Sequence, residues 1–107
     1  MSAQRIYFYY TGFYGGFEKL TFEELDGMIY EVQDRLEAEF PGSARDFQLE
    51  LTFFDPYANN EVEIDVSYII RPIEDDEGEI EIINKAIIEK LQEISIEIED
   101  VRYAGAN

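Results

Sequence analysis

Carboxylates and tyrosine hydroxyls are the groups in this chain that could do chemistry. The 107 residues include 25 Asp and Glu and 8 Tyr, but no His and no Cys. Without His and Cys the chain lacks the common nucleophile–base pairs and the soft ligands of transition metals. Carboxylates and tyrosines alone can carry out acid–base catalysis, so an enzyme of that kind is the third of three hypotheses.

No spacing among the acids selects a catalytic or metal site. Carboxylate pairs are so frequent that none indicates a glycosidase-like arrangement. The run EDDEGE at 74–79 has the composition of a calcium loop, but it lacks the D-x-D-x-D-G order and the terminal Glu. The segment GFYGG at 12–16 is not followed by the GK[ST] of a phosphate-binding loop. We therefore expect a protein that is not an enzyme and has no catalytic residue, cofactor or metal ion.

The net charge of −17 restricts the partners of this chain. Nucleic acid and anionic membrane surfaces would be repelled at long range, whereas a basic protein would be attracted. The apolar content of 46% is that of a globular chain, which predicts a folded acidic domain and not a disordered one. The N-terminus has no signal-peptide layout and no apolar run could cross a bilayer, so we expect a cytoplasmic protein.

The pattern of apolar residues predicts six elements in one domain spanning 1–107. Period-2 alternation or aromatic clustering indicates strands at 5–10, 46–54, 61–71 and 95–103, and 3.6-residue spacing indicates helices at 21–40 and 77–93. The order β-α-β-β-α-β is that of an α+β, ferredoxin-like split βαβ fold. Right-handed crossovers would place both helices on one face of a four-stranded antiparallel sheet, with the first and third strands at its centre.

Two local patterns refine the first helix and the first strand. Thr21 and Glu24 have the capping-box layout, and apolar residues recur at helical spacing at Phe22, Leu25, Ile29, Val32, Leu36 and Phe40. In the first strand Ile6, Phe8 and Tyr10 are expected to face the core. A slip of one residue would invert that assignment, because successive side chains point to opposite faces.

The other face of the sheet is left uncovered by helices in this fold. Its expected residues are Tyr7 and Tyr9 from the first strand, Gln48, Glu50 and Thr52 from the second, Glu63, Asp65 and Ser67 from the third, and Ser95, Glu97 and Glu99 from the fourth. An acidic strand face is often only solvated, and it also discourages edge aggregation. Tyrosines framed by charge are instead typical of a protein interface, and we favour that interpretation.

The glycine-rich stretch after Tyr10 is expected to be a loop. Phe13 or Phe17 would plug the end of the core, while Tyr14, flanked by Gly12, Gly15 and Gly16, would be exposed at the loop tip. Glycines are used where the backbone needs a positive φ, so the loop should have a defined shape.

We therefore expect a small acidic binding or inhibitor protein, monomeric or homodimeric, that docks its uncovered sheet face onto a basic protein. The target would be a nucleic-acid-handling protein, and the chain either a nucleic-acid mimic or an immunity protein against a nuclease toxin. Tyr7, Tyr9 and Tyr14 would anchor the partner, and Glu50, Glu63, Asp65, Glu97 and Glu99 would steer it. Direct binding of RNA by the tyrosines is disfavoured by the charge and by the lack of the basic consensus.

The second hypothesis is an engineered or de novo designed ferredoxin-like scaffold without evolved activity. The absence of Cys, His and Trp and the regular stretch EIEIINKAIIEKLQEI at 79–94 favour it. The unbalanced charge and the aromatic segment at 6–17 argue against it.

Overall fold

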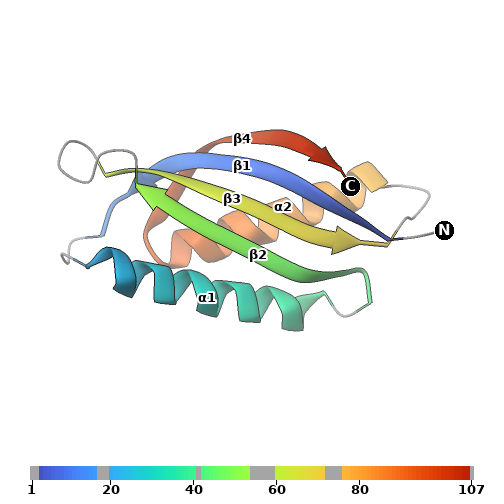
Figure 1. Cartoon of the computed structure of the whole chain (residues 1–107), viewed down its shortest axis with the longest axis horizontal. Helices are drawn as coiled ribbons and strands as arrows, with labels where there is room; N and C mark the ends of the chain where they lie inside the picture. Colours follow the sequence, from blue (N-terminus) through green and yellow to red (C-terminus); the bar gives the residue numbers. More distant parts are fainter. Residues whose placement is uncertain (1–2, 17–19, 41, 54–59, 72–75, 107) are drawn as a thin grey trace.

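The computed structural model describes residues 3–16, 20–40, 42–53, 60–71 and 76–106. Its elements are β1 (Gln4–Tyr14), α1 (Phe22–Glu39), β2 (Ala44–Phe53), β3 (Glu61–Ile70), α2 (Asp76–Glu93) and β4 (Ile96–Ala106). The strands form one antiparallel sheet in the order β2-β3-β1-β4 (Figure 1). The predicted ferredoxin-like split βαβ topology and its two central strands are thus confirmed.

One face of the sheet packs against both helices and forms the core. On β1 the inward residues are Ile6, Phe8 and Tyr10, which confirms the predicted register. Most of the rest of the core comes from alternate residues of the other strands and one stripe of each helix: Phe47, Leu49, Leu51, Val62, Ile64, Val66, Tyr68, Ile70, Ile96, Leu25, Ile29, Val32, Leu36, Ile83, Ile87 and Leu91. Alternation in the strands and helical spacing in the helices therefore meet in a single apolar layer.

Helix α1 begins at the predicted cap. The hydroxyl of Thr21 accepts a hydrogen bond from the backbone N–H of Glu24 at 3.1 Å and donates one to the Glu24 carboxylate at 3.2 Å. Leu25, Ile29, Val32 and Leu36 form the buried stripe of α1, whereas 48% of the surface of Phe22 is exposed. Phe22 lies on the border of the buried stripe, on the same flank of α1 as Asp26 and Tyr30.

The segment predicted as a loop after Tyr10 is the second half of β1. Tyr14 pairs with Ile96 of β4 and is buried in the core, so its predicted place at an exposed loop tip is wrong. Tyr14 closes the end of the core, as was expected of Phe13 or Phe17. Phe13 instead lies half-buried on the other face, and Phe17 falls outside the described residues.

The glycines of this segment allow close contacts and do not supply a positive φ. A Cβ on Gly12 would collide with the main-chain carbonyl oxygen of Glu97 in β4, and a Cβ on Gly16 would collide with the hydroxyl of Tyr14. Among the described glycines, the left-handed backbone occurs at Gly42 and Gly105. Gly12 is therefore required by the close approach of β1 to β4, and Gly16 by the side chain of Tyr14.

A small polar cluster ties the sheet to α2 inside the core. The hydroxyls of Tyr10 and Tyr68 both donate to the side-chain oxygen of Asn84, at 2.8 and 3.0 Å. Burial raises the pKa of each tyrosine above its usual value of about 10, and the neighbouring Tyr68 adds to the effect on Tyr10. Both hydroxyls therefore stay protonated in the folded chain at a pH where the unfolded chain would ionise.

Neither helix in the described part of the chain has the combination of length and apolarity that crossing a membrane requires.

The buried tyrosines make a prediction for alkaline pH. Because the folded pKa values lie above the unfolded value, this contribution to stability is complete below pH 10 and is lost as the pH rises further. The two groups together should lower the free energy of unfolding by about 2.7 kcal/mol per pH unit above pH 10. Urea unfolding between pH 8 and 11.5 measures this slope.

The matched variants are Tyr10→Phe/Tyr68→Phe, which removes both groups, and Tyr30→Phe, which removes an exposed tyrosine. The double variant should lose most of the slope above pH 10, and Tyr30→Phe should keep it. Equal slopes in the double variant and the parent chain would show that the buried hydroxyls do not govern the alkaline limit.

Candidate functional site

The uncovered side of the sheet, here called the open face, is built from cross-strand rows. Residues paired in register on neighbouring strands point to the same side. The rows that follow from the pairing are Gln48–Ser67–Tyr7–Gly105, Glu50–Asp65–Tyr9–Arg102, Thr52–Glu63–Thr11–Asp100 and Glu61–Phe13–Glu97. Six carboxylates and two exposed tyrosines therefore share one surface.

Most of the predicted interface residues lie on this open face. Tyr7 and Tyr9 are 36% and 45% exposed, and they occupy adjacent rows of the central strand β1. Glu50, Asp65 and Glu97 are exposed there as well, and Glu63 is half-buried between Thr52 and Thr11. Tyr14 is absent from the open face because it belongs to the core.

Glu99 is exposed but has no paired residue on β1, because the pairing of β4 with β1 is irregular at this point. The pairing shifts between Thr11 and Gly12 of β1, so that Asp100 lies opposite Thr11 and Ile98 lies opposite Gly12. Glu99 falls between these pairs, and the regular alternation resumes one residue later. Beyond Glu97, the residues of β4 that pair with the open-face positions of β1 are Asp100 and Arg102, which the alternation had not indicated. Ser95 precedes β4 and has a φ of 66°.

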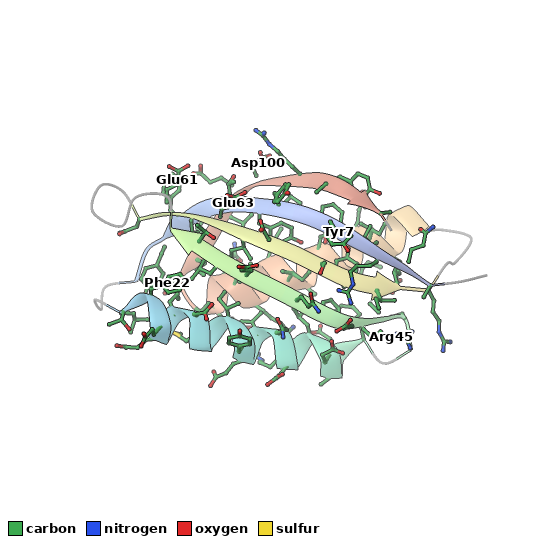
Figure 2. All side chains as sticks on the ribbon, in the orientation of Figure 1. Tyr7, Phe22, Arg45, Glu61, Glu63 and Asp100 are labelled. Carbon is green, nitrogen blue, oxygen red and sulfur yellow. The ribbon has the colours of Figure 1, made fainter. Side chains whose placement is uncertain are left out.

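Charge is unevenly distributed along the sheet. Figure 2 shows Glu61, Glu63 and Asp100 toward the end where β3 begins, and Arg45 at the opposite end. At that second end Arg5 forms an ion pair with Asp46 and donates a hydrogen bond to the hydroxyl of Ser67 at 3.0 Å. The open face therefore has an acidic end and a more basic end.

A groove of about 680 Å³ lies where the open face meets α1. Tyr7 and Tyr9 line it from the sheet, and Phe22 and Tyr30 line it from the helix. These are four of the six large apolar side chains that are exposed in the described part of the chain, the others being Ile82 and Tyr103. Aromatic exposure is thus concentrated at one place, here called the α1 groove.

The acids of the α1 groove come from three different elements. They are Asp26 of α1, Glu50 of β2 and Asp65 of β3, and the described residues that line the groove include neither Lys nor Arg. Aromatic rings with carboxylates between them are suited to bind cationic groups, since ring faces and carboxylates both attract positive charge.

The helical wall of the groove is fixed to the edge of the sheet. Gln33 of α1 accepts a hydrogen bond from the backbone N–H of Leu49 at 2.9 Å, and Glu37 accepts one from the N–H of Phe47 at 2.6 Å. Two residues of an extended strand and one turn of a helix both span about 6 Å along their axes. Side chains one turn apart on α1 can therefore reach alternate N–H groups of β2. Helix α1 consequently runs along β2 (Figure 1) and covers N–H groups of its outer edge.

The exposed flank of α1 was not predicted, because helical spacing of apolar residues indicates only the side of a helix that packs on the core. Phe22, Asp26 and Tyr30 are spaced at i, i+4 and i+8, which places them on one flank of the helix. Tyr30 in particular lies outside the buried stripe. In the sequence, the position of Tyr30 outside this stripe was the feature that could have indicated a second, exposed face of α1.

Within the described ranges, no three Asp or Glu side chains come together as a group that could hold a metal ion. The open face and the α1 groove can attract cations through their carboxylates and can contact a bound group through their aromatic rings.

Comparison with known proteins supports the fold of this chain but does not indicate its function. No protein-family model and no curated protein matches the chain. Among solved structures, it resembles hydantoinase/carbamoylase family amidases from Burkholderia multivorans (TM-score 0.56, 9% identity), Burkholderia ambifaria (0.56, 7%) and Burkholderia phymatum (0.52, 10%). Each match covers 98% of this chain but only 28–29% of the amidase. At such identity the likeness shows a shared fold alone.

The edge contacts of α1 make a prediction about stability. Gln33→Ala removes the acceptor for the N–H of Leu49, and it should lower the free energy of unfolding by about 1 kcal/mol. Amide hydrogen exchange at Leu49 should become faster. The neighbouring variant Asp34→Ala, at an exposed position of α1, should leave that amide unchanged. Equal exchange at Leu49 in the two variants would show that Gln33 does not hold the helix to the sheet.

Proposed function

We propose that this chain is a small acidic binding protein that docks its open face onto a cationic surface of another protein and blocks it. The observation that carries the proposal is the gathering of six carboxylates and two exposed tyrosines on one side of the sheet, beside a groove with two further aromatic residues. Interfaces commonly have aromatic anchors at the centre and a charged rim.

Electrostatics support a basic partner. With a net charge of −17, the chain would accelerate its encounter with a cationic surface and be repelled by nucleic acid. Outward side chains recur about every 6.7 Å along a strand, with neighbouring strands about 4.8 Å apart. Carboxylates on this lattice would engage several Arg and Lys groups at once, as phosphates do.

We therefore propose that the target is the phosphate-binding surface of a protein that handles nucleic acid. Two settings fit this chemistry equally: a nucleic-acid mimic that occupies a DNA- or RNA-binding protein, and an immunity protein that neutralises a basic nuclease. Both settings place the protein in the cytoplasm, as a monomer or homodimer, without catalytic activity of its own.

The engineered scaffold is the alternative. Idealised designs avoid non-glycine residues with positive φ, whereas Asp46, Asn60 and Ser95 have φ values of 54°, 56° and 66°. For that reason we place the binding protein first. The likeness of the fold to part of an amidase adds no specific observation in favour of an enzyme.

The proposal predicts capture of a basic protein. The immobilised chain should retain at least one basic nucleic-acid-binding protein at 50 mM salt, and retention should fall steeply by 300 mM because the attraction is screened. The captured protein should lose its binding to DNA or RNA when the chain is added, which a filter-binding or anisotropy assay measures.

The control is the variant Tyr7→Ala/Glu63→Lys/Glu97→Lys, which changes three open-face residues and leaves the core intact. It should release the partner. Retention of no basic protein at low salt, or equal retention by this variant, would contradict the proposed function. A scaffold without function would bind nothing and would resist unfolding to unusually high temperature.

A further inference from the structure

We propose that the α1 groove is the specificity pocket of this surface and receives an arginine side chain from an extended segment of the basic partner. The inference rests on the proposed function, because it names how the same surface recognises its partner. Charge, aromatic lining and row spacing each contribute to it.

The charges of the groove call for a cation from outside the chain. Glu50 and Asp65 lie directly opposite each other on β2 and β3, and like charges in that arrangement destabilise a sheet. The guanidinium in the same row, Arg102, donates instead to Asp100 at 2.7 Å and does not line the groove. A guest cation between Glu50 and Asp65 would relieve their repulsion.

The aromatic lining selects the kind of cation. Tyr9 is the next residue of the Glu50–Asp65 row, and Phe22 and Tyr30 line the groove from α1. A guanidinium is planar, so it can stack on a ring while its five N–H donors reach two carboxylates. The ammonium of lysine is compact and more strongly hydrated, and it has no flat face to stack. The groove therefore favours arginine over lysine.

The spacing of the open face selects an extended backbone for the segment that carries the arginine. Successive rows are two residues apart, or about 6.7 Å, which is also the distance between alternate side chains of an extended chain. An arginine at the Glu50–Asp65 row would place the next-but-one residue above the row that contains Glu63 and Asp100. The volume of about 680 Å³ lies within the range of about 300–1,000 Å³ typical of ligand sites.

Two peptides of equal charge test the inference. One is a fluorescent ten-residue peptide with arginine at alternate positions between Ser and Gly, and the other has lysine at the same positions. Fluorescence anisotropy at 100 mM salt should show at least fivefold tighter binding of the arginine peptide. Tyr30→Ala and Glu50→Gln should each weaken its binding about fivefold.

The controls change the same chemistry outside the groove. Tyr103→Ala removes an exposed aromatic side chain of β4, and Glu89→Gln removes an exposed carboxylate of α2 that does not line the groove. Both should change binding of the arginine peptide less than twofold.

The outcomes separate this inference from the proposed function. Equal affinity for the two peptides, or equal losses in Glu50→Gln and Glu89→Gln, would overturn the arginine pocket but leave an acidic surface that binds basic proteins. Failure to bind either peptide, together with failure to retain a basic protein at low salt, would overturn both.

Discussion

The hydrogen bonds from α1 to the outer edge of β2 are the constraint on which the candidate site depends. Gln33 and Glu37 bind backbone N–H groups that an edge strand would otherwise offer to another chain. The same contacts hold the flank of α1 beside the open face, where Phe22 and Tyr30 complete the groove with Tyr7 and Tyr9. One set of interactions thus protects the sheet edge and builds the aromatic wall.

The concentration of carboxylates on the open face opposes folding, and the rest of the structure must compensate for it. Neighbouring carboxylates such as Glu50 and Asp65 repel each other and lower the stability of the sheet. The core compensates with a continuous apolar layer and with the Tyr10–Asn84–Tyr68 cluster, which fixes α2 to the central strands. A cationic partner would turn the repulsion between the acids into a favourable contact, which is why stability and function are linked in our proposal.

The sequence was sufficient for the fold and for part of the site. Alternation predicted the inward residues of β1, β2 and β3, and it therefore placed Tyr7, Tyr9, Glu50, Glu63 and Asp65 correctly on the open face. It did not predict Asp100 and Arg102 on that face, because a bulge is a pairing irregularity that leaves no period in the sequence. It failed at Tyr14, because glycines were interpreted as a loop when they permit close approach of strands. The groove needed the position of α1 relative to β2, which depends on long-range contacts.

Residue-specific mapping of a bound cation tests the central claim, that the open face and its groove are the binding surface. Backbone amide chemical shifts of the labelled chain would be followed while the arginine-containing peptide is added at 100 mM salt. Our account predicts the largest changes at Tyr7 and Tyr9 of β1, Glu50 of β2, and Asp26 and Tyr30 of α1. Equal changes at the exposed acids of α2, such as Glu81 and Glu89, would contradict it, because they would show attraction by net charge alone.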